Sequence, residues 1–177
     1  MSPEELAPLL KKLRKTPLHD PSTGRPVDYG QEALYRILPH RAPFLLIDGI
    51  NSLDLERRTI RGWRTLRADD PIFAGHFPGT PVYPGVLQVE MTGQLGLCLA
   101  HFVTRHTYEI TPDASPAEIR ALRIHHAQYQ LPIVPGDVVE IHATILDEDG
   151  MTATCAGQIA KANRIASFAV QEVYFVE

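Results

Sequence analysis

The segment that begins at Pro84 constrains the fold most. It reads PGVLQVEMTGQLGLCLAHFV and places apolar or small residues on nearly every side of a helix. A helix that is apolar all round is normally buried in a protein core. Its single carboxylate, Glu90, therefore needs a partner, because ionised carboxylates are almost never fully buried alone. Gln94 lies one turn further along the same face and can donate a hydrogen bond to it. The chain is thus expected to fold around this helix.

The loop before the helix supplies a histidine, in the stretch GHFPGTPVYPGV that runs from Gly75 to Val86. A titratable His76 and a buried Glu90 near one helix N-terminus favour acid–base chemistry. A neutral imidazole is suited to removing a weakly acidic proton, and burial is expected to raise the pKa of Glu90 so that it can return one. The backbone N–H groups of Gly85 and Val86, in the first helical turn, can bind an oxygen that gains negative charge.

Apart from this helix, the hydrophobic pattern predicts two shorter helices and a block of strands. The helices are expected at 2–15, where Ser2 and Glu5 form a capping box, and at 31–38, with a Pro/Gly-rich connector over 17–30 between them. Strands are expected at 44–50, 58–66, 119–130, 138–146, 151–160 and 165–176, with turns at 147–150 and 162–163. This order predicts an α+β fold in which an antiparallel β-sheet wraps around one long central helix.

Composition excludes several functional classes. The 177 residues carry a formal net charge of −4, which argues against a nucleic-acid or anionic-membrane partner. No uninterrupted apolar run has the length of a membrane span, and no signal peptide is recognised at the N-terminus. The two cysteines, Cys98 and Cys155, are expected to be reduced core residues, which suits a cytoplasmic location. The adjacent His125 and His126 are expected to point to opposite faces of a strand, so a shared metal is not expected.

Three blocks of sequence resemble those of a known family, in the same order. They are GHFPGTPVYPGVLQVEMTGQLG, LPHRAPFLLID at 38–48 and PIVPGD at 132–137. The sequence resembles the hotdog-fold 3-hydroxyacyl-acyl carrier protein dehydratases of the FabZ type over about residues 31 to 176. The resemblance implies a hydro-lyase that converts 3-hydroxyacyl thioesters to trans-2-enoyl thioesters in fatty-acid, related lipid or polyketide synthesis.

The same resemblance implies a role for each matching residue. His76 would be the base and Glu90 the acid, and the carbonyl of Val82 would orient the histidine ring. The Gly85 amide, beside Val86, would bind the thioester carbonyl, and Gln94 would support the carboxylate. Tyr83 is either core filler or a gate of the acyl channel. The two catalytic residues of one site would come from different subunits of a homodimer or of a higher assembly of dimers. No metal or redox cofactor is implied, since phosphopantetheine arrives with the substrate.

Some features depart from the family pattern or stay open. Residues 1–30 form an extension that the family lacks, so we divide the chain into 1–30 and a dehydratase domain at 31–177. The segment before PIVPGD lacks the Arg and Lys residues that face an acidic carrier in the family. Lys11, Lys12, Arg14 and Lys15, or Arg120 and Arg123, are candidates to replace them. The carrier, acyl carrier protein or coenzyme A, stays open. Two alternative functions are a hotdog thioesterase and a non-catalytic acyl-binding subunit.

Overall fold

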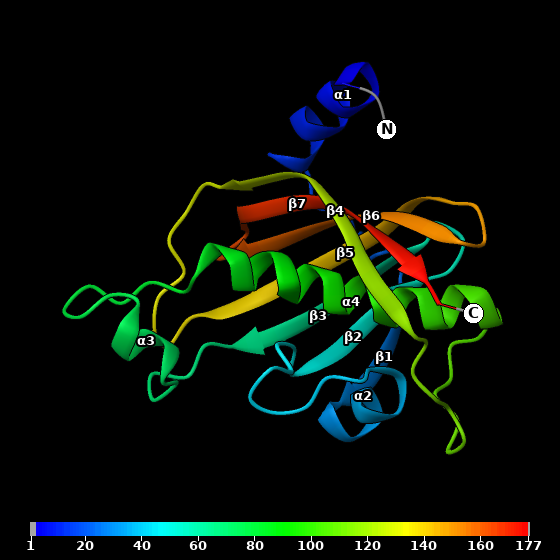
Figure 1. Cartoon of the computed structure of the whole chain (residues 1–177), viewed down its shortest axis with the longest axis horizontal. Helices are drawn as coiled ribbons and strands as arrows, with labels where there is room; N and C mark the ends of the chain where they lie inside the picture. The colour runs from blue at the N-terminus through cyan, green and yellow to red at the C-terminus, as the bar shows by residue number, and fades with distance from the viewer. Residues whose placement is uncertain (1–2, 177) are drawn as a thin grey trace.

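The computed structural model describes residues 3–176 as one seven-stranded antiparallel sheet with four helices (Figure 1). The helices are α1 (Pro3–Leu13), α2 (Gln31–Ile37), α3 (Ile72–Gly75) and α4 (Gly85–Arg105). The strands are β1 (Arg25–Gly30), β2 (Gly49–Asp54), β3 (Thr59–Thr65), β4 (Ile119–Tyr129), β5 (Val138–Glu148), β6 (Thr152–Lys161) and β7 (Arg164–Phe175). Their order across the sheet is β1-β2-β3-β5-β6-β7-β4.

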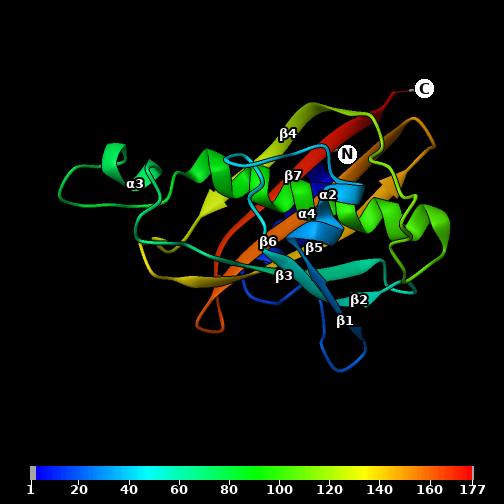
Figure 2. The same cartoon turned by 90° about the horizontal axis from the view of Figure 1, so that it is seen from below.

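The long helix α4 lies along the concave face of the sheet, and the strands curve around it (Figures 1 and 2). Its buried side chains, such as Leu95, Leu99 and Phe102, share one core with Ile60 of β3 and Ile141 of β5. The predicted α+β architecture is confirmed. By length and composition alone α4 could also cross a membrane, but 61% of its apolar window is buried inside the molecule. Its place at the centre of the core accounts for its hydrophobicity.

Helix α1 covers the opposite, outer face of the sheet. Leu13 is fully buried among side chains of β6 and β7, including Ile165 and Phe168, and the other leucines of α1 pack at the edge of this cluster. The amide of Gln158 in β6 donates to the carbonyl oxygens of Leu13 (2.7 Å) and Thr16 (2.8 Å). The leucine face of α1 is therefore docked on the sheet. The predicted capping box involves Ser2, which lies outside the described residues.

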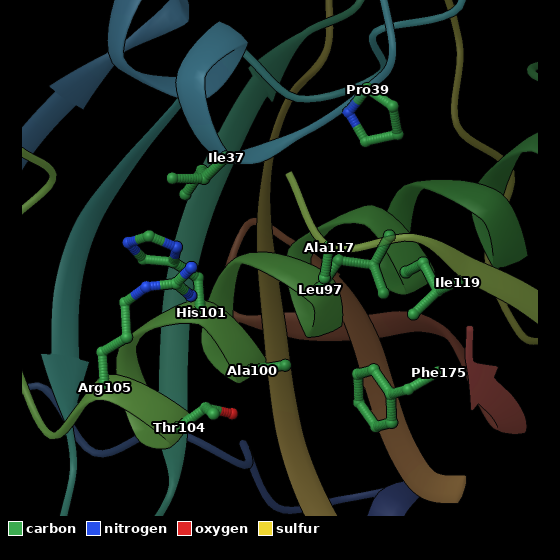
Figure 3. Close-up of a pocket in the computed structure, with 10 residues that line it drawn as sticks. All are labelled: Ile37, Pro39, Leu97, Ala100, His101, Thr104, Arg105, Ala117, Ile119 and Phe175. Atoms are coloured by element: carbon green, nitrogen blue, oxygen red, sulfur yellow. The ribbon is translucent and has the colours of Figure 1, made fainter. Parts of the chain in front are cut away.

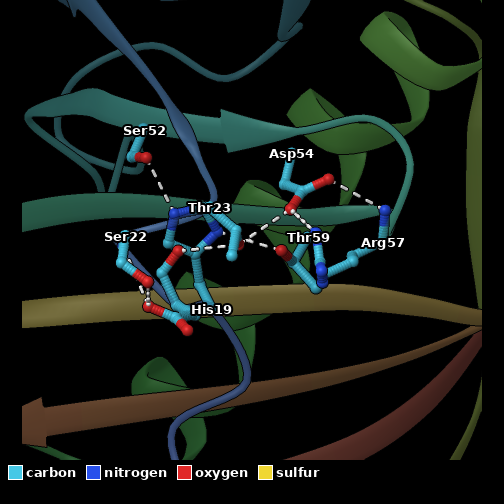
Figure 4. A network of polar contacts seen from close by, with 8 residues as sticks. His19, Ser22, Thr23, Ser52, Asp54, Arg57 and Thr59 are labelled. Carbon is cyan, nitrogen blue, oxygen red and sulfur yellow. Dashed lines mark hydrogen bonds and ion pairs between the residues drawn. The ribbon is translucent and has the colours of Figure 1, made fainter.

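The segment after α1 is tied to the sheet by a buried polar network (Figure 4). The ring of His19 is 1% exposed, and its two nitrogens contact Thr59 Oγ1 (2.9 Å) and Ser52 Oγ (2.8 Å). A Cβ at Gly24 would lie 2.4 Å from the same ring, so this close approach requires glycine. This anchoring histidine was not anticipated, because its partners lie more than thirty residues away.

Two sequence-based expectations about strands are wrong. Residues 44–48 are irregular, and the strand begins only at Gly49. The side-chain amide of Gln94 takes the place of a neighbouring strand there: its oxygen accepts from Leu46 N–H (2.8 Å) and its nitrogen donates to Phe44 O (2.9 Å). The connector expected over 17–30 contains β1, which lies at the edge of the sheet, where Pro26 costs no hydrogen bond. The division of the chain at residue 30 stays a prediction.

The expectation for His125 and His126 is also wrong. The register of β4 against β7 shifts between Ile124 and His126, as in a β-bulge. His125 Nε2 lies 2.9 Å from Glu172 Oε2, while the ring of His126 stacks on Phe168. Glu172 and Phe168 are four residues apart on β7 and therefore lie on one face. The remaining strands and both turns lie within two residues of their predicted positions.

Candidate active site

The ring of His76 is held in one orientation by the loop that joins α3 to α4. Its Nδ1 lies 2.8 Å from the carbonyl oxygen of Val82, and the amide of Val82 donates back to the carbonyl of His76 at 2.8 Å. Because a carbonyl oxygen can only accept, Nδ1 carries the proton of the neutral ring. The lone pair then lies on Nε2, which is the form of imidazole that acts as a base. This contact with Val82 is the one that the resemblance implies.

His76 lines a cleft of about 490 Å³, which we call the His76 cleft. Its walls are His76, Val82, Tyr83, Gly85, Val86, Gln88 and the segment 129–132. The amide N–H groups of Gly85 and Val86 make no hydrogen bond within residues 3–176, because the chain turns into α4 only there. The cleft therefore combines a potential base with two free backbone donors.

Tyr129, at the end of β4, is a further residue of this cleft that the sequence did not reveal. A Cβ at Gly85 would lie 2.6 Å from its ring, so the ring lies directly against the start of α4. Only glycine permits this contact. No motif pointed to Tyr129, because the contact joins the ends of two elements that are distant in the sequence.

Tyr83 belongs mainly to the core. The residue is 1% exposed, its ring centroid lies 5.9 Å from that of Phe73, and the guanidinium of Arg64 lies over the ring at 5.8 Å from its centroid. Its hydroxyl finds no hydrogen-bond partner in the part of the chain that the structure describes, and burial raises its pKa to about 12. Of the two readings left open for Tyr83, this burial favours core filler that also forms a cleft wall.

Glu90 has the expected partner and also an unexpected one. Gln94 Nε2 donates to Glu90 Oε1 at 2.9 Å, as the spacing predicted, and His40 Nε2 lies 3.3 Å from the same oxygen. The side chain is 35% exposed in the single chain. The hydrogen bond from His40 holds the pKa of Glu90 below its ordinary value, and the bond from Gln94 adds to this, although burial opposes both. The expectation of a raised pKa is therefore wrong.

His40 was present in the block LPHRAPFLLID but had no role assigned to it. The only signal in the sequence was the block itself, since fifty residues separate the two side chains. Its Nδ1 is buried and has no partner among the described residues. The His40–Glu90 contact places a second imidazole beside the candidate acid.

Within one chain, His76 and Glu90 do not meet. Glu90 is not among the residues that line the His76 cleft, and within residues 3–176 no hydrogen bond or ion pair joins the two side chains. Glu90 lies on a strip of α4 that the chain's own sheet leaves uncovered, together with Val86, whose side chain is 74% exposed. Each half of the candidate site is formed, but the halves are separate.

Comparison with known proteins identifies the class to which this fold and site belong. The family model described as FabA-like domain matches residues 38–169, and the chain belongs to this family. The solved structure of the dehydratase heterocomplex ApeI:P from Xenorhabdus doucetiae superposes with a TM-score of 0.63 at 20% identity, covering 81% of this chain and 91% of that one. This likeness shows the shared hotdog fold.

Two curated relatives narrow the comparison. The 3-hydroxyacyl-[acyl-carrier-protein] dehydratase FabZ of Anaeromyxobacter sp. (strain Fw109-5) is 36% identical over 150 residues, which cover 80% of this chain and 90% of the relative. The FabZ of Methylobacterium sp. (strain 4-46) is 41% identical over 108 residues, which cover 60% of this chain and 61% of the relative. The resemblance to dehydratases of the FabZ type is thereby confirmed.

Proposed function

We propose that this protein dehydrates 3-hydroxyacyl thioesters, carried by an acyl carrier protein, to trans-2-enoyl thioesters in fatty-acid or related lipid synthesis. The observation that carries the proposal is the His76 cleft. It holds an imidazole with its Nε2 free beside two unbonded amides at the start of α4. The FabZ relatives are named for this reaction.

The proposed reaction is an elimination of water that is assisted by two proton transfers. His76 Nε2 takes a proton from C2, while the Gly85 and Val86 amides bind the thioester oxygen as it gains charge. The electron pair forms the C2–C3 double bond as the C3–O bond breaks. Glu90, in its protonated form, gives a proton to the departing oxygen, so that water leaves. His76 then loses its proton to solvent, and Glu90 regains one.

His40 has a part in this scheme because of the lowered pKa of Glu90. An ionised carboxylate cannot donate, so the acid must receive a proton before each turnover. His40 lies 3.3 Å from the carboxylate and can share one proton with it. We assign His40 as the group that takes up a proton from solvent and passes it to Glu90 before each turnover, which returns His40 to its neutral form. Gln94 keeps the carboxylate in place through its bond to Oε1.

A second copy of the chain would bring the two halves together. The strip of α4 that carries Glu90 is uncovered, and the edge strand β4 exposes Leu122 and Ile124, which are 54% and 58% exposed. An unpaired strand edge favours pairing with another strand. We therefore propose a homodimer, or an assembly of such dimers, in which His76 of one subunit serves Glu90 of the other. A solved structure similar to this chain is a heterocomplex, and native mass spectrometry of the purified protein distinguishes that arrangement from a homodimer.

The other parts of the proposal follow from the chemistry. Proton transfer to and from carbon and oxygen needs no metal or redox cofactor, and the phosphopantetheine belongs to the substrate carrier. Both cysteines are free and buried, and burial raises the pKa of Cys155 to about 12, so its thiol stays protonated. A cytoplasmic location stays a prediction.

One assay tests the function against its alternatives. The purified protein is incubated with 3-hydroxybutyryl and 3-hydroxydecanoyl thioesters, each on acyl carrier protein and on coenzyme A, and the products are identified by mass. Loss of one water supports the dehydratase. Loss of the acyl group from its carrier would instead support a thioesterase, and an unchanged substrate would support a non-catalytic acyl-binding subunit.

A further inference from the structure

Tyr129, in the His76 cleft, has no role in the reaction proposed above. It is the last residue of β4, and its side chain is 48% exposed and lines the cleft that the substrate would enter. Its hydroxyl group forms no hydrogen bond within residues 3–176. A free hydroxyl is often just hydrated, so its position relative to the reacting atoms decides whether it has a function.

The hydroxyl end of the Tyr129 ring lies against Gly85, whose amide is the proposed donor to the thioester. A Cβ built on Gly85 would lie 2.6 Å from Cζ, 2.8 Å from Cε1 and 3.0 Å from Cε2 of the ring. The hydroxyl oxygen is bonded to Cζ, the nearest of these three atoms. The hydroxyl group therefore lies beside the start of α4, where the amides of Gly85 and Val86 are free.

The backbone on both sides of this contact is fixed by hydrogen bonds. The amide of Gln130, next to Tyr129, donates to the carbonyl oxygen of Ala166 at 2.7 Å. The amide of Tyr83, just before α4, donates to Ile133 O at 2.7 Å and so ties the start of the helix to the segment that follows Tyr129. A donor that is already in place stabilises developing charge without a cost of reorganisation.

The other polar side chains of the His76 cleft are not available as donors to the thioester. The side-chain amides of Gln88 and Gln130 donate to backbone carbonyl oxygens, at 3.2 Å and 3.3 Å respectively. The hydroxyl of Tyr83 is buried, and His76 presents the unprotonated Nε2. Among the lining residues that the structure describes, Tyr129 thus carries the remaining side-chain donor.

The cavity beside the C-terminal half of α4 offers no donor to the same oxygen. It has a volume of about 110 Å³ and is lined by residues that include Leu97, His101 and Phe175 (Figure 3). It shares no lining residue with the His76 cleft. A further group that acts on the thioester therefore has to come from the His76 cleft itself.

The chemistry of a phenol fits the thioester oxygen. A carbonyl oxygen has two lone pairs and can accept more than one hydrogen bond, whereas a phenol donates one. Partial burial raises the pKa of Tyr129, so the hydroxyl stays protonated at neutral pH. The C3 hydroxyl group of the substrate is the less suitable partner, because it leaves toward Glu90, which does not line this cleft within one chain.

We propose, on the basis of the dehydratase function above, that the Tyr129 hydroxyl is a third donor to the thioester oxygen, beside the amides of Gly85 and Val86. As His76 Nε2 takes the proton from C2, negative charge develops on this oxygen and the hydrogen bond from Tyr129 strengthens. The hydroxyl keeps its own proton throughout, so the proton balance of the reaction is unchanged. Tyr129 is thus a catalytic residue that contributes a hydrogen bond and transfers no proton.

The test is Tyr129→Phe, which removes the hydroxyl and keeps the ring against Gly85. We expect kcat for the 3-hydroxydecanoyl thioester to fall about tenfold, the effect of losing one hydrogen bond to a charged atom, with KM within twofold of wild type. The temperature of thermal unfolding should not change, because the ring contact is kept. Tyr174→Phe, which removes a hydroxyl from β7 outside the cleft, is the matched control and should have wild-type kinetics.

Three results would overturn the role of Tyr129. The first is a fall in kcat of less than threefold in Tyr129→Phe. The second is a raised KM with unchanged kcat, because the hydroxyl would then bind a part of the substrate that does not change in the reaction. The third is a fall in kcat that comes with a lowered unfolding temperature or occurs equally in Tyr174→Phe, since packing would then be the cause.

These results are distinguishable from a failure of the proposed function. In all three, a wild type that dehydrates the 3-hydroxydecanoyl thioester leaves the dehydratase function intact. A wild type that dehydrates neither this substrate nor 3-hydroxybutyryl thioester contradicts the function itself, and the role of Tyr129 with it.

Discussion

At the scale of single residues, the bond from His76 Nδ1 to the carbonyl of Val82 does more than fix a ring. It determines which nitrogen carries the proton, and so which one is free to act on the substrate. Glu90 is the opposite case, since its neighbours His40 and Gln94 favour its ionised form. The two candidate catalytic groups therefore start in different protonation states. His76 can accept a proton at Nε2, whereas Glu90 must first receive the proton that it donates.

Replacing either group should abolish most of the activity. His76→Ala and Glu90→Gln should each leave a folded protein and lower kcat by roughly 10²-fold or more, the usual effect of a positioned acid or base. The double variant should be little worse than either single variant, because both act on one transition state. Steady-state dehydration kinetics, with circular dichroism as the check on folding, measure this. Near-normal turnover in either single variant would refute its assigned role.

His19 should make stability depend on pH. Burial, followed by the nearby His142 and Arg61, lowers its pKa to about 4, although the carboxylates of Asp54 and Asp20 oppose this. A depressed histidine pKa means that the folded state loses stability as pH falls from about 6.5 toward 4, since the unfolded chain binds the proton more readily. His142 is buried as well and its pKa is also lowered, so it contributes in the same direction.

We expect urea denaturation to show a loss of unfolding free energy between pH 7 and pH 5 that is smaller in His19→Gln than in the wild type. His106→Asn serves as the control, because His106 is exposed and its left-handed backbone conformation is one that asparagine tolerates. An equal pH dependence of the unfolding free energy in His19→Gln and the wild type would show that protonation of His19 does not cause the loss of stability.

At the scale of elements, α1 joins an apolar face to a basic end. Its leucines are docked on β6 and β7, whereas Lys11, Lys12, Arg14 and Lys15 are exposed. Arg14 Nε donates to Gln128 Oε1 at 3.1 Å, and Gln128 precedes Tyr129, which lines the His76 cleft. The basic end of α1 therefore lies next to the mouth of the proposed active site, where an acidic carrier protein would have to dock.

Removing this charge should weaken the use of a carrier-bound substrate. Replacing Lys11, Lys12, Arg14 and Lys15 by Gln should raise KM for the substrate on acyl carrier protein, with an effect that shrinks as salt is added, and should barely change KM for a short thioester mimic. The pair Lys12→Gln/Lys15→Gln has a matched control in Arg36→Gln/Arg105→Gln, which removes the same charge at two other exposed positions. Unchanged KM values for both substrates in the fourfold variant would leave α1 with a packing role only.

At the scale of the whole molecule, the main observation is that His76 and Glu90 are separate within one chain. The two residues are fourteen positions apart in the sequence, yet they face different surroundings because the turn of α4 directs Glu90 to the uncovered strip. With the roles proposed for His76 and Glu90, a single chain holds the two halves of the site apart. Activity should therefore depend on assembly.

Mixing two inactive proteins tests this directly. His76→Ala and Glu90→Gln proteins, combined under conditions that allow subunit exchange, should regain activity. Half of the dimers are mixed, and each mixed dimer has one of its two sites intact, so recovery should approach about a quarter of the wild-type value. Exchange is verified by native mass spectrometry of differently tagged subunits. If exchange is proven and activity stays absent, both residues of one site come from the same chain.

The sequence by itself determined the parts of this protein that depend on local pattern. The apolar run from Pro84 predicted the core helix, and the strands from residue 138 to the end were placed within two residues, because alternation and the turns at Gly150 and Asn163 define them locally. The contact of Glu90 with Gln94 also follows from local spacing, because the two residues lie four positions apart on one helix. The contact of His76 with Val82 was instead implied by the resemblance to the FabZ-type dehydratases.

The tertiary structure decided whatever depends on partners distant in sequence. The apolar residues 44–48 form no strand because the side chain of Gln94, about fifty residues away, satisfies their backbone. The pKa of Glu90 falls because His40 reaches it from another segment, and His19 is buried because β2 and β3 provide its hydroxyl partners. The local sequence determines which side chain stands at each position of a helix or strand. Only the folded chain determines which group lies opposite that side chain, and its hydrogen bonding and pKa depend on that group.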